Sequence, residues 1–453
     1  MAKNKTRFVC QQCGYVTPKW LGKCPECGTW DSFVEEVAVA TPNKTFLAGC
    51  EKAVPTTISK VTKEKVERIT THVGEFDRVL GGGIVPGSLI LLAGSPGIGK
   101  STIALDVGMQ VAAGGRKVLY VSGEESEAQT AMRAERLGKA SDNLLIMTAT
   151  ELTGILLQGK ALNPCLLVID SIQTMYNSQL ETAAGSVGQV RECTADLLRF
   201  AKESNIAVMI IGHVTKEGNI AGPRLLEHMV DVVLQFEGEK SYAFRVLRAV
   251  KNRFGSTEET GIFSMEAEGL KEVVNPSGLF LEKKDNILPG SAITAVMEGN
   301  RPILTEIQAL VARTPFGLPR RTAVGIDFNR VNILLAVLEK RVGMNFGMED
   351  AYVCALGGMK ITEPAADLAI VAALVSSFRN TPLTFGSLCL GEVGLTGELR
   401  PINAVERRIK EGRKLGFSHF VVPKNSMTKA LEDVKDVYPV STVEEALSII
   451  LPQ

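Results

Sequence analysis

A short apolar segment that leads into a glycine-rich loop is the first part of the sequence whose residue types and spacing suit chemistry. Leu89–Ala93 is followed directly by Gly94-Ser95-Pro96-Gly97-Ile98-Gly99-Lys100-Ser101-Thr102. Glycines at this spacing let successive backbone N–H groups turn toward a phosphate chain, and the following helix adds the positive end of its dipole. We expect Lys100 to neutralise the β- and γ-phosphates of ATP and Ser101 to hold Mg²⁺. The loop from Gly94 to Thr102 is therefore predicted to bind nucleotide, the alternative being a chance glycine turn.

Acidic residues follow two other apolar segments. Leu166–Ile169 ends in Asp170, which is predicted to reach the Mg²⁺ shell at the carboxyl edge of a sheet. Hydrolysis also needs a carboxylate that polarises the attacking water. Glu124 and Glu125 follow Val118–Val121. We favour Glu124, with Glu125 as the alternative, because only one of two adjacent side chains points at the γ-phosphate.

Four cysteines near the start of the chain have the spacing of a metal site. Cys10 and Cys13 form one C-x-x-C pair, Cys24 and Cys27 form another, and a glycine follows each pair. Four thiolates complete a tetrahedral Zn²⁺ site, so we predict a structural zinc ribbon whose folding depends on the metal, with a small hairpin carrying Trp20 between the pairs. A redox role is the alternative. DNA and protein both remain open as the ribbon's partner; nucleic acid is suggested by Lys3, Lys5, Arg7, Lys19 and Lys23.

The whole-chain composition narrows the class of protein. The 453 residues exceed what one hydrophobic core usually organises, so two or three domains are expected. Lys and Arg total 50 and Asp and Glu also total 50, which argues against wholesale coating of nucleic acid. No apolar run approaches the roughly 20 residues of a membrane span, and no signal-type segment begins the chain. We therefore expect a cytoplasmic protein with no membrane partner.

Hydrophobic periodicity divides the chain. We predict a C4 zinc ribbon over residues 1–36, a linker over 37–68, an ATPase domain over 69–275 and a further α+β domain over 276–453. Within the ATPase domain, apolar strand-like runs alternate with helical patterns, which predicts an α/β fold with a parallel sheet covered on both faces. The runs are Leu89–Ala93, Val118–Val121, Leu144–Met147, Leu166–Ile169, Val208–Ile211 and Val230–Phe236.

Two polar loops are expected at the same edge of this sheet. They span Gln173–Arg191 and Thr215–Glu227, and the second carries Lys216 and Arg224. If subunits form a ring, we expect both loops to face its channel and to contact the phosphate backbone of a nucleic acid there. The alternative is that they are ordinary solvent-exposed loops. His213, at the end of a predicted strand, either senses the γ-phosphate or caps the sheet edge.

A cationic motif, Lys251-Asn252-Arg253-Phe254-Gly255, ends an apolar strand that begins at Phe244. Residues two apart on a strand project to the same side, so Lys251 and Arg253 are predicted to project together. We interpret them as a pair that reaches the nucleotide of a neighbouring subunit, with Arg253 as an arginine finger. The alternative is an ordinary charged strand end.

The cysteine ribbon, the Gly94–Ser101 loop, Asp170 and the motif at 251–255, in this order, resemble the RadA (Sms) family of bacterial DNA-repair proteins over the whole chain. The resemblance implies a RecA-like ATPase, related to hexameric replicative helicases, that uses ATP, Mg²⁺ and Zn²⁺. It implies a homo-hexameric motor that binds single-stranded and branched DNA and drives branch migration. It also implies that a recombinase or a replicative helicase is a protein partner. It also implies DNA contacts by Lys216, Arg224, Lys251 and Arg253.

The last part of the chain is similar to the proteolytic domain of Lon proteases, which uses a Ser-Lys dyad. Where that family has its serine, this chain has Ala365, and where it has its lysine, this chain reads Glu406. We therefore expect the Lon-like fold without peptidase activity, serving assembly and presenting a basic face. The candidates for that face are Arg379, Arg400, Arg407, Arg408, Lys410, Arg413 and Lys414. An ATP-dependent protease and a non-motor ATPase adaptor remain the alternative functions.

Overall fold

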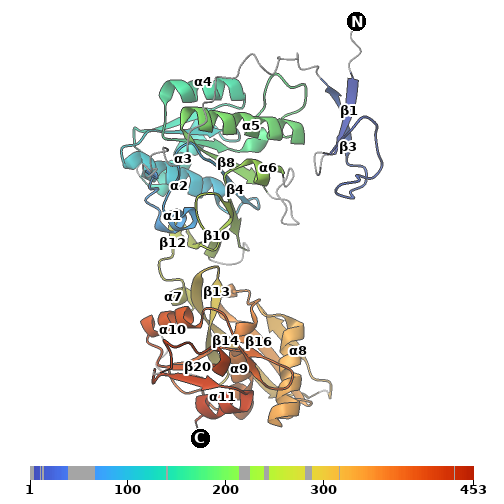
Figure 1. Cartoon of the computed structure of the whole chain (residues 1–453), viewed down its shortest axis with the longest axis vertical. Coiled ribbons are helices and arrows are strands. Elements are labelled where there is room, and N and C mark those ends of the chain that lie inside the picture. Colours follow the sequence, from blue (N-terminus) through green and yellow to red (C-terminus); the bar gives the residue numbers. More distant parts are fainter. Residues whose placement is uncertain are drawn as a thin grey trace. The chain divides into compact units, whose positions relative to one another are not determined.

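The chain divides into two compact units, Met1–Val273 and Val274–Gln453, in a computed structural model (Figure 1). Each unit is described by itself below. The structure describes residues 5–10, 12, 15–38, 67–138, 141–213, 225–238, 244–280, 288–315, 317–432 and 434–452. Within these residues no helix has both the length and the apolar character that crossing a membrane requires.

The ribbon is a small antiparallel sheet in the order β2-β1-β3, formed by β1 (Lys5–Cys10), β2 (Val16–Thr17) and β3 (Phe33–Ala38). Among the residues of the ribbon that the structure describes, the buried cluster consists of Cys10, Cys24 and Phe33, with Phe8 packed against it. So small an apolar cluster cannot stabilise a fold alone, which fits the expected dependence on a metal. Trp20 lies between the cysteine pairs but outside the strands, so the predicted hairpin does not form around it.

A nine-stranded sheet in the order β12-β11-β10-β9-β4-β8-β7-β5-β6 forms the centre of the ATPase domain. Six neighbouring strands run parallel to one another, in the order β9-β4-β8-β7-β5-β6. Strands β10, β11 and β12 extend the sheet beside β9 as an antiparallel meander. Their bounds are β4 Leu89–Gly94, β5 Val118–Ser122, β6 Leu144–Thr148, β7 Leu166–Asp170, β8 Ala207–His213, β9 Val232–Glu237, β10 Phe244–Asn252, β11 Thr260–Glu266 and β12 Gly269–Glu272.

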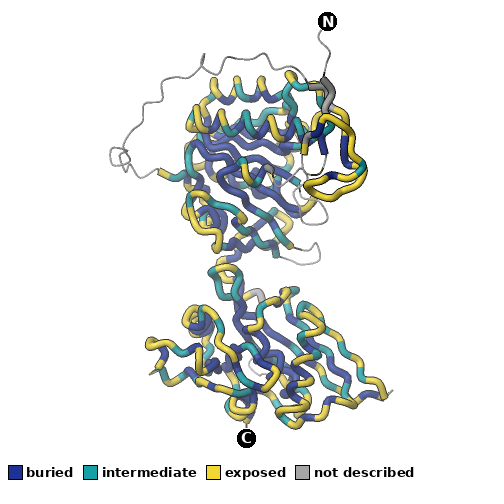
Figure 2. The backbone as a smooth tube through the Cα atoms, turned by 45° about the vertical axis from the view of Figure 1, so that its right-hand side comes forward, coloured by how far each residue is buried: buried dark blue, intermediate teal, exposed yellow. Residues whose placement is uncertain are grey.

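Side chains of the central strands alternate between two cores, one on each face of the sheet. On β4, Ile90 and Leu92 belong to one core, whereas Leu89 and Leu91 belong to the other. Because both faces are covered, the strands read as continuous apolar runs, as expected for a parallel sheet. Figure 2 shows the sheet buried between its helices.

Helices α2 and α5 lie on opposite faces of this sheet, because α2 contributes to the first core and α5 to the second. Helix α5 begins at Val187, capped by Ser186, so the end of the predicted loop 173–191 is helical. The last predicted strand begins at Val232 rather than Val230. The helix bounds are α1 Gly74–Leu80, α2 Lys100–Ala113, α3 Glu127–Leu137, α4 Leu152–Leu162, α5 Val187–Ser204 and α6 Leu225–Met229.

The second unit is built on a seven-stranded mixed sheet in the order β15-β16-β14-β13-β17-β20-β21. Helix α9 is its central helix, with every residue from Asp367 to Ser376 buried. The strand bounds are β13 Ser291–Glu298, β14 Arg301–Arg313, β15 Arg321–Val324, β16 Glu349–Ala355, β17 Ser387–Cys389, β20 His419–Pro423 and β21 Val437–Val440. The helices include α7 Ser277–Phe280, α8 Phe328–Val337, α9 Asp367–Arg379, α10 Val405–Lys414 and α11 Val443–Ile450.

Candidate nucleotide and metal sites

The glycine-rich loop joins the end of β4 to the start of α2, as a phosphate-binding loop must. Gly97 and Gly99 have φ values of 77° and 113°, in the region that L side chains rarely adopt. A Cβ at Gly99 would lie 2.8 Å from Leu270 Cδ1, so only glycine fits there. The loop is therefore held in a tight curl at the carboxyl edge of the sheet, where the N-terminus of α2 adds its positive dipole end.

Lys100 is folded into the curl of this loop. Its Nζ donates to Gly94 O at 2.8 Å and to Ser95 O at 3.0 Å. Burial lowers the pKa of Lys100 to about 8, and the negative charges of Asp170 and Glu124 oppose this shift. A bound polyphosphate would supply the compensating charge that this buried ammonium needs.

Asp170 ends β7 and its buried carboxylate has a partner that sequence reasoning missed. Tyr120 donates its hydroxyl to Asp170 Oδ2 at 2.6 Å. Tyr120 is buried on β5, and burial raises its pKa well above the usual value. Strands β5 and β7 are neighbours, with Tyr120 opposite Val168. The contact between Tyr120 and Asp170 therefore depends on the order and register of the strands, which the sequence does not reveal. Tyr120 thus orients the carboxylate predicted to reach the Mg²⁺ shell.

The two adjacent glutamates after β5 face different partners. Glu124 Oε1 accepts a hydrogen bond from Ser171 Oγ at 2.6 Å and lies 3.6 Å from His213 Nε2. Glu125 instead forms an ion pair with Arg133 on α3. Only Glu124 therefore faces the ends of β7 and β8, beside the phosphate-binding loop.

Unpartnered polar atoms collect at the same edge. Both amide atoms of Gln173 and Nδ1 of His213 are buried and have no hydrogen-bond partner within the described part of the chain. Buried polar groups are nearly always hydrogen-bonded, so these atoms indicate a polar ligand or ordered water at this edge. Together with the glycine cradle and the buried ammonium of Lys100, they fit ATP, with Ser101 and Asp170 as the residues that would hold its Mg²⁺.

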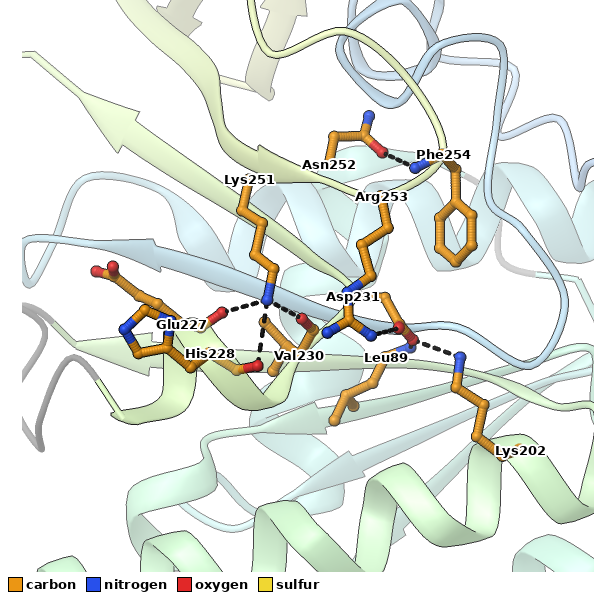
Figure 3. Close-up of polar contacts among 10 residues, drawn as sticks. All are labelled: Leu89, Lys202, Glu227, His228, Val230, Asp231, Lys251, Asn252, Arg253 and Phe254. Atoms are coloured by element: carbon orange, nitrogen blue, oxygen red, sulfur yellow. Dashed lines mark hydrogen bonds and ion pairs between the residues drawn. The ribbon is translucent and has the colours of Figure 1, made fainter.

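Lys251 and Arg253 lie near the opposite edge of the sheet and project together (Figure 3). Lys251 ends β10, and its Nζ donates to the carbonyls of Glu227 at 2.8 Å, His228 at 3.2 Å and Val230 at 2.8 Å. These carbonyls belong to the C-terminal end of α6, whose last turn lacks intrahelical partners. Lys251 therefore caps α6 within its own subunit.

Arg253 follows the end of β10 and forms an ion pair with Asp231 at 3.2 Å. The carboxylate of Asp231 is 2% exposed, and it also accepts from Lys202 Nζ at 2.7 Å and from Leu89 N at 3.0 Å. Leu89 begins β4, whereas Gly94 ends it. Arg253 is thus roughly 16 Å along the strand from the phosphate-binding loop of its own subunit.

Some predicted site residues lie outside the described residues. These are Lys216, Arg224 and the zinc ligand Cys13. The other three cysteines of the set, Cys10, Cys24 and Cys27, come together with their Sγ atoms within 4.8 Å of one another. Three converging thiolates fit Zn²⁺, with these residues and Cys13 as its ligands.

The region that corresponds to the Lon dyad contains an ion pair whose arginine is buried. Glu363 lies just before Ala365, and its carboxylate accepts from Arg408 Nη1 at 2.7 Å and Nη2 at 2.8 Å. Arg408 is 1% exposed, so it does not belong to the predicted basic face. Glu406 instead accepts from Thr428 Oγ1 at 2.5 Å. No nucleophile and base of the dyad type therefore meet among these residues.

Several of the other residues proposed for the basic face also have partners in the second unit. Arg413 forms two hydrogen bonds with Asp436, Lys414 pairs with Glu411 and Arg400 pairs with Glu398. These ion pairs reduce the net positive charge of helix α10 and its surroundings.

Family models match three parts of the chain. One described as a rubredoxin metal binding domain matches residues 8–35, one described as an AAA domain matches 56–219, and one described as subunit ChlI of Mg-chelatase matches 318–426. The fold and the sites together define a RecA-like P-loop ATPase with a zinc ribbon before it and a Lon-protease-like α+β domain after it.

Relatives match the chain from end to end. The DNA repair protein RadA of Bacillus subtilis (strain 168) is 52% identical and covers 99% of both chains. The DNA repair protein RadA of Halalkalibacterium halodurans is 50% identical, and the match covers 100% of both chains. That of Listeria monocytogenes is 51% identical, and the match covers 100% of this chain and 99% of the relative. The chain belongs to the RadA family of DNA repair proteins. Among solved structures, the RadB recombinase covers 45% of this chain and 99% of its own at 24% identity, with a TM-score of 0.37, a similarity too low to carry an argument.

Proposed function

We propose that this protein is a DNA-stimulated ATPase of recombinational repair that binds single-stranded DNA as a homo-hexameric ring and drives branch migration. One observation carries the proposal: the residues predicted to hydrolyse ATP lie at one edge of the sheet, and the predicted arginine finger lies at the opposite edge. Lys100, Glu124 and Asp170 lie at the carboxyl edge, and Arg253 lies at the amino edge. Because Arg253 is too far from its own loop to touch a phosphate there, a role in catalysis requires a neighbouring subunit.

The residues at the carboxyl edge have distinct tasks in this proposal. Water would attack the γ-phosphorus of bound ATP and ADP would leave, while Ser101 and Asp170 would hold a Mg²⁺ that offsets the phosphate charge. Glu124 takes the proton of the attacking water at its carboxylate, which the hydroxyl of Ser171 holds in position. Lys100 exchanges its bonds to Gly94 O and Ser95 O for phosphate oxygens. Arg253 of an adjacent subunit stabilises the charge that develops on the γ-phosphate.

The DNA part of the proposal is supported by family membership and by the predicted loops. The relatives are named DNA repair proteins. Lys216 and Arg224 would contact the phosphate backbone. Lys251, through the end of α6 that it caps, and Arg253 would couple nucleotide binding to DNA binding. Branched DNA, and a recombinase or replicative helicase as protein partner, belong to the same proposal.

We also propose that the second unit has no peptidase activity. Ala365 has no hydroxyl to attack a peptide, and the carboxylate of Glu406 cannot act as a lysine base. A wild-type chain that cleaved an unfolded protein substrate in the presence of ATP would contradict this part and favour the ATP-dependent protease.

The experiment that tests the function is ATP hydrolysis by the full chain with and without single-stranded DNA, at two salt concentrations. We expect DNA to accelerate hydrolysis and higher salt to weaken that effect, because phosphate contacts release counterions. Hydrolysis that ignores DNA at both salt concentrations would favour a non-motor adaptor. For such an adaptor, Lys100→Ala would leave the biological role of the protein intact. For the proposed motor, the same substitution would abolish that role.

A further inference from the structure

The zinc ribbon carries both tryptophans of the chain, and both are exposed. Trp20 is 51% exposed and Trp30 is 70% exposed. A single exposed apolar side chain is ordinary, but two indoles on a domain with so small a core point to a binding surface.

The two indoles flank the same glycine. A Cβ added at Gly22 would lie 3.7 Å from Trp20 Cη2 and 3.9 Å from Trp30 Cζ3. The backbone fixes this arrangement, because Lys23 and Trp30 form an antiparallel bridge and Asp31 N donates to Gly22 O at 2.9 Å. This turn thus holds both indoles beside the same small residue, Gly22.

Ammonium groups accompany the rings. Lys23 Nζ lies 5.6 Å from the centroid of the Trp30 ring, and the exposed Lys19 directly precedes Trp20. The acidic side chains Glu26 and Asp31 are exposed on the same turns, so the local charge is balanced rather than strongly basic. We call Lys19, Trp20, Gly22, Lys23 and Trp30 the tryptophan platform.

We propose that the tryptophan platform stacks unpaired bases of single-stranded DNA. Each base has an aromatic face, so stacking on an indole tolerates any sequence, and a lysine beside the ring holds the adjacent phosphate. An aliphatic protein-docking patch would not need two ring faces with ammonium groups beside them. Since the local charge is balanced, stacking carries most of the contact. The inference rests on the proposed function, because that function supplies the single strand.

The chain offers a direct reporter, because all of its tryptophan emission comes from the platform. A labelled oligothymidylate is titrated with the full chain while its anisotropy and the intrinsic tryptophan emission are recorded together. We expect the emission to fall as the anisotropy rises. Trp30→Ala is expected to weaken binding about 5-fold or more, and Trp30→Phe to restore most of the affinity, since it keeps a ring. Val34→Ala, which removes an exposed apolar side chain without a ring, serves as the matched control and should bind normally.

Zinc content per chain verifies that each variant keeps the ribbon folded. Normal binding of oligothymidylate by Trp20→Ala and Trp30→Ala, with constant emission in the wild type, would overturn the platform and leave DNA binding by the ATPase domain intact. Equal weakening by Val34→Ala would also overturn it, because a general apolar patch would then be responsible. No binding of the oligonucleotide by the wild type would overturn both the platform and the proposed function.

Discussion

The guanidinium of Arg253 lies 3.2 Å from the buried carboxylate of Asp231, and Lys202 contacts the same carboxylate at 2.7 Å. Arg253 is 55% exposed, whereas Asp231 is held between β4 and β9. Because Lys202 and the Leu89 N–H remain as partners, Arg253 can leave Asp231 without stranding a buried charge. The ion pair therefore holds the exposed Arg253 in a way that still permits its release, as the proposed role at an adjacent subunit requires.

The two cations that share Asp231 are expected to differ in function. Arg253→Ala should lower DNA-stimulated ATP hydrolysis on the order of 10³-fold, because it removes the arginine that we propose acts on the nucleotide of an adjacent subunit. Lys202→Ala removes the other partner of Asp231 and should leave kcat nearly unchanged. Thermal melting of both variants controls for folding. Similar losses of kcat in the two variants would mean that Arg253 acts only through Asp231.

The two glutamates after β5 provide a second matched pair. Glu124→Gln should lower kcat by about 10²- to 10⁴-fold while nucleotide binding is kept, because only the proton acceptor is lost. Glu125→Gln breaks the contact with Arg133 and should hydrolyse ATP normally. Steady-state hydrolysis and equilibrium binding of a fluorescent ATP analogue separate the two effects. The assignment is wrong if Glu125→Gln is the inactive variant.

Neighbouring arginines of α10 are expected to differ in stability. Arg408→Ala removes two hydrogen bonds from the partly buried Glu363 carboxylate, which keeps the one from Met297 N, and should cost about 1–3 kcal/mol. Arg407→Ala removes an exposed side chain that contacts Asn300 and should stay within about 0.5 kcal/mol of the wild type. Urea unfolding of the full chain measures both. Equal midpoints would contradict the buried ion pair.

Zinc removal should expose a defined set of thiols. With the metal bound, the ribbon cysteines are protected as ligands, whereas Cys193 and Cys389 are protected by burial, which raises the pKa of each to about 12. A strong chelator should therefore release the ribbon thiols to a thiol reagent at pH 8 and leave these two unreactive. A thiol count that does not change on chelation would argue against the Zn²⁺ site.

The same shift has a consequence for stability against pH. The pKa of Cys389 is higher in the folded state than in the unfolded chain, so the folded state keeps a proton that the unfolded chain loses above about pH 9. The contribution of this thiol to the free energy of unfolding is complete below that pH and declines as the pH rises further. Alkaline unfolding of the wild type compared with Cys389→Ala measures it.

Local patterns predicted the elements that carry the nucleotide site. The apolar runs at β4, β5 and β7 and the glycine loop need only neighbouring residues to be recognised, and the structure places all of them in one sheet. Contacts between distant segments were not predictable. Tyr120 reaches Asp170 only because β5 lies beside β7, and the partners of Lys251 are backbone carbonyls of a separate helix.

Arg408 shows a signal that the sequence did contain. The predicted basic face includes it, yet the buried residues of α10 share the helical spacing of one stripe, and they are Val405, Arg408, Ile409 and Gly412. Applying that periodicity to the charged residues as well would have separated Arg408 from Arg407. The identity of its partner, Glu363, still depends on tertiary packing.

The most direct test of the account is to mix two inactive variants, Lys100→Ala and Arg253→Ala, and measure DNA-stimulated ATP hydrolysis. In the proposed ring, a Lys100→Ala subunit would still supply Arg253 to the intact nucleotide loop of an adjacent Arg253→Ala subunit. With equal amounts, about one interface in four should be restored, and activity should return. A mixture that assembles into mixed rings and stays as inactive as its parents would contradict the claim that Arg253 completes the site of an adjacent subunit.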